Sequence, residues 1–169
     1  AQAICRAARQ PDTPLVHTKT QEQSDIQALH RARELHVHSR TALANQIRGF
    51  LVEDGLIIPK GICHVRKQLP AFISDLENSL STQKRDLLQE EYSQLLNLDA
   101  RINCLTRKIQ NLSKERDDCR RLMKIPGVGP MIATAMVSVA GAGKQFANAR
   151  AFSSYLGLVP REYSSGGKQ

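Results

Sequence analysis

A heptad repeat of large aliphatic residues is the feature of this sequence that most restricts its fold. The repeat consists of Leu88, Leu95, Ile102 and Ile109, with Leu98, Leu105 and Leu112 each three residues after a partner. An apolar seam at a and d positions over three or more heptads is typical of a coiled coil rather than of a helix in a globular core. We therefore expect a long helix that packs on an earlier helix of the same chain, on a second copy, or on both.

A second long helix is expected from about Thr20 to Asp54, where apolar residues approximate a 3.6-residue spacing and Gly55 offers a stop. Its other faces carry basic residues, which form either a solvated surface or one that follows phosphates. These residues are Arg31, Arg33, Arg40, Arg48, His30, His36 and His38. Prolines and glycines between Gly55 and Pro70 predict a connection with at most a short helical turn.

The net charge of +8 and the pI near 9.6 indicate a polyanionic partner. No apolar run approaches the roughly 20 residues of a membrane span, and the N-terminus does not resemble a signal peptide. We therefore expect a cytoplasmic protein that binds nucleic acid and no membrane. The four cysteines form no C-x-x-C pair, which argues against a metal site and predicts small buried residues.

A short hairpin of helices is predicted after Cys119. Gly127 and Gly129 allow a sharp turn and a close approach of the backbone to a ligand, and Pro130 suits the first position of the second helix. Four apolar residues are expected to lock the two helices together, namely Ile125, Val128, Ile132 and Met136. The fold class is thus mainly all-α, with long antiparallel or coiled-coil helices followed by a small helical domain.

The pattern is that of a helix-hairpin-helix, which binds the DNA backbone through free N–H groups without reading base sequence. The candidate DNA-binding residues are Lys124, Gly127, Val128, Gly129 and Lys144. A purely structural pair of helices is the alternative interpretation, because such hairpins are common.

The C-terminal residues carry a resemblance to a known family. The runs P-G-V-G-P-M-I-A-T-A and G-L-V-P-R-E-Y-S-S-G-G-K resemble the transposase domain of the insertion-sequence one-hundred-and-ten family, relatives of the Piv and MooV invertases. Residues 19–34 and 41–51 are similar to the central region of the same family. The resemblance covers nearly all of the chain.

The resemblance implies a transposase that joins a RuvC-like nuclease domain, a coiled coil and a transposase domain. It implies recombination of DNA directed by a structured guide RNA, with a serine nucleophile that corresponds here to Ser164, or to its neighbour Ser165. Arg161 and Lys168 would offer positive charge to the phosphate. Attack by a serine hydroxyl conserves the phosphodiester energy as a phosphoserine link, so the strand can be rejoined without ATP. Taken alone, Ser-Ser-Gly-Gly also fits an ordinary loop.

The sequence departs from the family at both ends. The acidic D-x-x-D ligands that would hold Mg²⁺ in the family precede the stretch that is here Ala1–Cys5, so they are expected outside the chain, which itself needs no cofactor. The other end stops at Gln169, one residue after Gly-Gly-Lys. We therefore expect the tail of a RuvC-like domain (1–19), a coiled-coil segment (20–119) and a truncated helix-hairpin-helix domain (120–169). Such a chain binds DNA, assembles as a homo-oligomer through the coiled coil, and is inactive alone. The alternative is a non-catalytic module that binds nucleic acid and dimerises.

Overall fold

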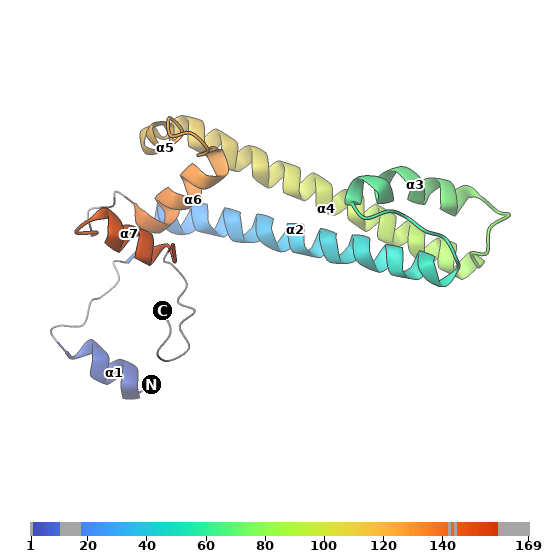
Figure 1. Ribbon diagram of the computed structural model, residues 1–169, viewed down its shortest axis with the longest axis horizontal. Helices are drawn as coiled ribbons and strands as arrows, with labels where there is room; N and C mark the ends of the chain where they lie inside the picture. The colour runs from blue at the N-terminus through green and yellow to red at the C-terminus, as the bar shows by residue number, and fades with distance from the viewer. Residues whose placement is uncertain (1, 11–17, 142, 144, 159–169) are drawn as a thin grey trace, which may run out of the picture.

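The computed structural model describes residues 2–10, 18–141, 143 and 145–158 (Figure 1). Within these ranges the chain forms seven α-helices and no strand, which confirms the all-α prediction. The helices are α1 (Gln2–Ala8), α2 (Gln21–Glu53), α3 (Ile62–Ser74), α4 (Thr82–Glu115), α5 (Asp117–Leu122), α6 (Pro130–Ala140) and α7 (Ala149–Tyr155). None of the helices in the described ranges has both the length and the apolar character needed to cross a bilayer.

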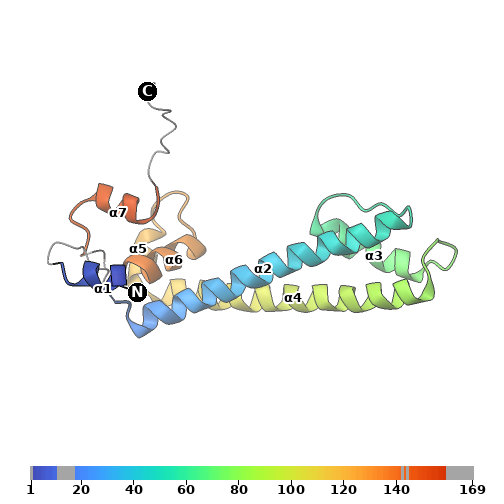
Figure 2. The ribbon, with the colours of Figure 1, turned by 90° about the horizontal axis from the view of Figure 1, so that it is seen from below.

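Helices α2 and α4 lie side by side in opposite directions and form a long arm (Figures 1 and 2). Hydrogen bonds along the arm show the antiparallel order. Asp54 pairs with Lys84 at 2.6 Å, Arg40 with Asp99 at 3.1 Å, and Arg33 with Thr106 at 2.8 Å. A helix of 33 residues spans about 50 Å at about 1.5 Å per residue, so the arm is much longer than it is wide.

Local capping explains where α2 begins and ends. The Thr20 hydroxyl accepts a hydrogen bond from the Gln23 N–H at 3.2 Å, and the Gln23 side chain accepts one from the Thr20 N–H at 3.0 Å. This capping box satisfies two N–H groups that a helix start leaves free. At the other end Gly55 adopts φ +77°, which ends the helix without steric cost. The bounds predicted from the sequence are correct to within one residue.

The segment between the long helices differs from the prediction, because it contains the 13-residue helix α3 rather than a short turn. Pro70 lies inside this helix and has no N–H to donate to the carbonyl of Arg66, four residues earlier. The hydroxyl of Tyr92 on α4 donates to that carbonyl instead, at 3.3 Å. A tertiary contact thus replaces the missing helical hydrogen bond, and the sequence of the segment alone does not reveal it.

The main core lies at the end of the arm where α3 packs on α2 and α4. Its buried residues include Ile47, Leu51, Val65, Leu69, Leu88 and Leu95. The first positions of the heptad repeat are 0 to 4% exposed along the whole of α4, whereas Leu98, Leu105 and Leu112 are only half-buried. Packing inside one chain therefore covers one row of the predicted seam completely and the other row only in part.

The short helices α5 and α6 lie at the opposite end of the arm (Figure 2). Helix α6 packs against α2, α4 and α5, so the predicted C-terminal unit rests directly on the arm. Phe146 stacks in a tilted arrangement on Phe152 and on Tyr155 of α7, with ring centroids 5.1 Å apart in both pairs.

Candidate nucleic-acid interface

Helices α5 and α6 are joined by a tight turn of residues 123–129. The carbonyl of Ile125 accepts a hydrogen bond from the Val128 N–H at 3.0 Å, with Pro126 and Gly127 between them. Gly127 has φ +85°, and proline followed by glycine at the central positions is typical of a type II turn. The left-handed conformation at Gly127 is therefore what reverses the chain, in agreement with the role predicted for that glycine.

The two helices are held together by a small apolar core of Cys119, Ala133 and Val137, with Val128 packed against it. The prediction that Ile125 and Ile132 lock the helices together is wrong, because these side chains are 51% and 49% exposed. The buried face of α6 is set by residues four apart, and Ile132 lies about 100° around the helix from Ala133. Met136 is half-buried and lies outside this core.

The first turn of α6 presents unused hydrogen-bond donors. Pro130 is the first residue of the helix, as predicted, and Gly129 is its N-cap, with no side chain hydrogen-bonded there. The first N–H groups of a helix have no partner within the helix, and the helix dipole adds partial positive charge at this end. A Cβ placed on Gly129 would meet no atom within 4 Å. Packing therefore does not require glycine at this position, whereas close approach of a ligand would.

Three cations lie beside the turn. Arg120, Arg121 and Lys124 line a shallow hollow together with Asp117, and Arg120 forms an ion pair with Asp117. Arg121 and Lys124 are exposed, and neither forms an ion pair within the described part of the chain. The hollow thus carries excess positive charge on the hairpin.

Arg116 connects the hairpin to the first turn of α2. It occupies the break between α4 and α5, where it is the C-cap of α4 and the N-cap of α5. Its guanidinium donates to Asp118 at 2.9 Å and to Glu22 at 2.9 Å. The hydrogen bond from Arg116 holds the pKa of the Asp118 carboxyl below its usual value, and the same bond raises the pKa of Arg116.

Two further contacts fix α6 on α2. The Gln23 side chain donates to the carbonyl of Val137 at 3.2 Å, and His30 Nε2 lies 2.9 Å from the Thr134 hydroxyl. That hydroxyl donates to the carbonyl of Pro130 at 2.7 Å, so it accepts from His30. Burial lowers the pKa of His30, and nearby Arg33 lowers it further. His30 is therefore a structural contact between α2 and the first turns of α6.

Most of the arginines on α2 form hydrogen bonds within the fold and are therefore not available to bind phosphates. Arg33 donates to the Thr106 hydroxyl, Arg40 to Asp99, and Arg48 to the carbonyl of Ile58 at 3.2 Å. Of the four arginines considered from the sequence, Arg31 is the one that is exposed. The hypothesis of a phosphate-following surface on α2 is therefore not supported by the positions of these side chains.

Part of the predicted site lies outside the described residues. Lys124, Gly127, Val128 and Gly129 all belong to the hairpin turn, so the structure brings these four together. Lys144 and the proposed catalytic group of Arg161, Ser164, Ser165 and Lys168 fall outside the ranges that the structure describes. Their roles therefore stay predictions.

The cysteines follow the prediction only in part. Cys119 is buried in the hairpin core, where loss of solvent raises its thiol pKa to about 11. Cys5, Cys63 and Cys104 are exposed, so the expectation that all four are buried is wrong. The described residues contain no group of three or more His, Cys, Asp or Glu side chains that could hold a metal ion. The Mg²⁺ that the resemblance implies therefore has no ligand set among these residues.

Several residues of this end of the molecule were missed by reasoning from the sequence. Arg120 and Arg121 adjoin Lys124, and their charge and position beside the predicted turn were a usable signal. Gln23, His30 and Arg116 hold the hairpin in place through contacts between segments about 90 to 115 residues apart in the chain. No local pattern marks such contacts.

Comparison with known proteins finds similarity to transposases. Residues 119–169 match the family described as the IS116/IS110/IS902 transposase family. The whole chain is 38% identical over 169 residues to the transposase for insertion sequence element IS1111A of Coxiella burnetii, covering 100% of this chain and 46% of that protein. It is 40% identical over 178 residues to a probable family 20 transposase of Pseudomonas aeruginosa, covering 100% of this chain and 50% of that protein.

A third relative, the transposase for insertion sequence element IS1328 of Yersinia enterocolitica, is 33% identical over 168 residues, or 99% of this chain and 49% of that protein. The chain is thus similar over nearly its whole length to part of these transposases. Over residues 119–169 the similarity is to the IS116/IS110/IS902 transposase family. It spans about half the length of the curated relatives it matches. No solved structure matches it.

Proposed function

We propose that this chain is the DNA-holding part of a transposase and that the α5–α6 hairpin binds the phosphate backbone of duplex DNA. One observation carries the proposal: the first turn of α6 is uncapped and follows the open position of Gly129, and the cations Arg120, Arg121 and Lys124 line a hollow on the same hairpin. Backbone N–H groups at a helix start bind phosphate oxygens, and such contacts do not depend on base sequence. The hairpin therefore holds DNA and does not select it.

The test measures binding to two unrelated duplexes of equal length by fluorescence anisotropy at several salt concentrations. We expect similar affinities for both and a linear fall of log K with log salt. Gly129→Val should weaken binding to both duplexes, because the added side chain keeps the phosphate away from the N–H groups. Gly49→Val is the matched control, since Gly49 likewise has open space around its Cβ but lies on α2 away from the hairpin. Equal affinities of the two variants would reject the assignment.

We further propose that assembly is a second function of the arm. The half-buried row of Leu98, Leu105 and Leu112 supports this, because packing within one chain leaves that row partly open. A second copy would cover it and complete the seam. Sedimentation of Leu105→Lys should show a smaller species than the unchanged chain. An unaltered species with unaltered helix content would argue against assembly through this row.

The chemistry proposed for the longer protein rests on the resemblance. We propose Ser164, or Ser165 next to it, as the nucleophile on a DNA phosphodiester, with Arg161 and Lys168 offering positive charge. Mg²⁺ would be held by acids outside this chain, and a structured guide RNA would be a further partner. The division into residues 1–19, 20–119 and 120–169 belongs to the same proposal. In the longer protein, Ser164→Ala should abolish strand exchange while DNA binding is retained. Residual exchange would point to Ser165.

A further inference from the structure

The outer face of α4 changes its charge along the helix. Near the α3 end its exposed charged residues are the acids Asp86 and Glu90. Toward the hairpin, four exposed cations follow one another, namely Arg101, Arg107, Lys108 and Lys114, and the exposed acid Glu115 ends the helix. No acid lies in the sequence between Asp99 and Glu115. A solvated helix face usually mixes both signs at i,i+4 spacing, so a run of one sign calls for another explanation.

These four cations point away from the rest of the arm. Ile102 and Ile109 are buried, and Thr106 between them contacts Arg33 of α2. In the heptad repeat, Arg101 and Lys108 occupy g positions and Arg107 and Lys114 occupy f positions. Those positions lie roughly 240° and 140° around the helix from the buried row. The cations therefore straddle the side of α4 that faces away from α2.

The corresponding half of α2 has the opposite character. Its exposed charged residues are the acids Glu22, Asp25 and Glu34 and the single base Arg31. The two long helices thus give this half of the arm a basic side and an acidic side. A polyanion is attracted to the α4 side and repelled from the α2 side.

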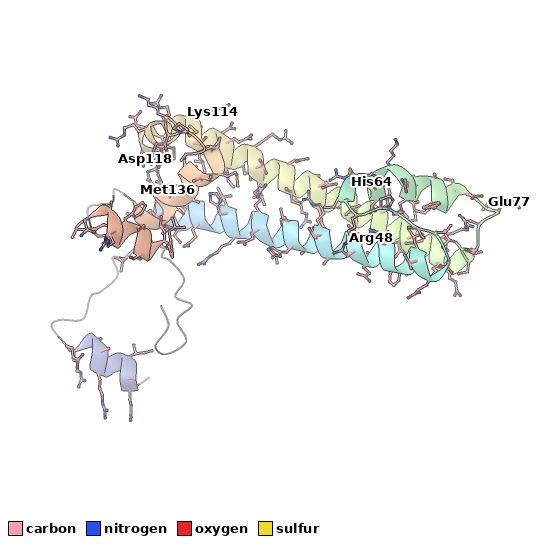
Figure 3. The ribbon with its side chains drawn as sticks, in the orientation of Figure 1. Arg48, His64, Glu77, Lys114, Asp118 and Met136 are labelled. Atoms are coloured by element: carbon pink, nitrogen blue, oxygen red, sulfur yellow. The ribbon has the colours of Figure 1, made fainter. Side chains whose placement is uncertain are left out.

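The basic side of α4 leads directly to the hairpin. Arg116 ends α4 and begins α5, so Lys114 lies close to the helix that carries Arg120 and Arg121. Figure 3 shows Lys114 at the same end of the molecule as Asp118 of α5, far from Arg48 and His64. Arg101, Lys108 and Lys114 form no ion pair in the described part of the chain, so no neighbouring carboxylate there compensates their charge.

We propose that the outer face of α4 from Arg101 to Lys114 binds the phosphate backbone of duplex DNA, as a continuation of the hairpin. The proposal rests on the DNA binding proposed above for the hairpin. The 14 residues from Arg101 to Lys114 span about 20 Å of helix, which corresponds to about six base pairs at about 3.4 Å each. The face carries no aromatic residue on which single-stranded bases could stack, which favours a duplex over a single strand.

The test compares two triple variants that each remove two lysines and one arginine. Arg101→Gln, Lys108→Gln and Lys114→Gln together neutralise the proposed face. Arg31→Gln, Lys60→Gln and Lys67→Gln together form the control, because these residues are exposed but lie on α2 and at the α3 end. Circular dichroism and thermal melting of both variants should match the unchanged chain. Duplex affinity is measured over a salt series with DNA of about 8 and about 20 base pairs, since the longer duplex spans both the hairpin and the face.

The slope of log K against log salt is negative, and we expect its magnitude to be smaller by about 3 in the α4 variant. Each of the three lost phosphate contacts contributes about 0.9 to that magnitude. Its affinity for the longer duplex should fall about tenfold or more, and the gain on lengthening the DNA should disappear. The control should lose no more than about twofold, because Lys60 and Lys67 lie at the α3 end of the arm and Arg31 lies on the acidic side of α2.

Equal losses in the two triple variants would overturn the proposal for α4 while leaving the hairpin intact. Unchanged binding by Gly129→Val would instead overturn the hairpin function, so the two failures are distinguishable. A matched series with duplex RNA completes the experiment. Loss of RNA binding alone in the α4 variant, with DNA binding unchanged, would overturn DNA as the partner of this face.

Discussion

Arg116 Nη1 lies 2.9 Å from Glu22 Oε2, which ties the break between α4 and α5 to the first turn of α2 across 94 residues of sequence. The same guanidinium also bonds Asp118, so one side chain joins three helices at the base of the hairpin. Because this contact holds the start of the hairpin against α2, it helps to set the direction in which α6 presents its free N–H groups.

Replacing Arg116 with Gln should destabilise the fold by about 1 to 2 kcal/mol, because hydrogen bonds to two carboxylates are lost at a side chain that is less than a third exposed. Urea unfolding followed by circular dichroism measures the change. Arg120→Gln is the matched control, since Arg120 pairs with Asp117 on an exposed surface. Exposed pairs contribute little, so the control should change stability by no more than about 0.5 kcal/mol. A control as unstable as Arg116→Gln would contradict the assigned role.

The contact between His30 and Thr134 predicts a dependence of stability on pH. The pKa of His30 is lowered from its ordinary value of 6.5, chiefly by burial. Below that value the unfolded chain takes up the proton more readily than the folded chain does. The stability associated with neutral His30 is therefore complete above about pH 6.5 and is lost as the pH falls toward the lower pKa of the folded state.

His30→Gln keeps a side-chain N–H donor for Thr134 and removes the titration. The unchanged chain should lose more thermal stability between about pH 7.5 and about pH 5.5 than the variant does. These two pH values lie about one unit above and below the ordinary histidine pKa. The other histidines are present in both proteins, so their contribution cancels. Identical pH profiles would show that His30 does not titrate differently on folding.

The two glycines of the turn should respond differently to alanine. Gly127 has φ +85°, so Gly127→Ala should cost about 1 to 2 kcal/mol of stability. Gly129 has φ −91° and ψ 179°, an extended conformation that any residue adopts, so Gly129→Ala should change stability by no more than about 0.5 kcal/mol. Denaturant unfolding distinguishes them. Comparable losses in both variants would mean that Gly129 is needed for the fold, which would weaken its use as evidence for a ligand.

The two rows of the heptad repeat should also differ in how much each contributes to the stability of the fold. Ile109 is 0% exposed, so Ile109→Ala should cost about 2 to 5 kcal/mol. Leu105 is only half-buried within one chain, so Leu105→Ala should cost less at low protein concentration. If copies assemble through that row, the cost for Leu105→Ala should rise as the protein concentration rises. Thermal melts over a concentration series measure this, and a cost that stays constant would count against assembly there.

The sequence by itself determined those parts of the protein that depend on local chemistry. The heptad repeat predicted α4, Thr20 and Gly55 marked the bounds of α2, and the proline and glycines after Ile125 predicted the hairpin turn. Periodicity, capping and left-handed backbone conformations involve residues within a few positions of one another. These features can therefore be predicted from the order of amino acids alone.

Only the tertiary structure decided how these elements are used. It extended a helix through Pro70 by giving the Arg66 carbonyl a partner on α4, and it engaged three arginines of α2 in contacts that hold the arm together. It also exposed Ile125 and Ile132, which the sequence had placed in the core. The physical reason is that burial, ion pairing and the direction of a charged face depend on which distant helix lies alongside, and no local pattern specifies that neighbour.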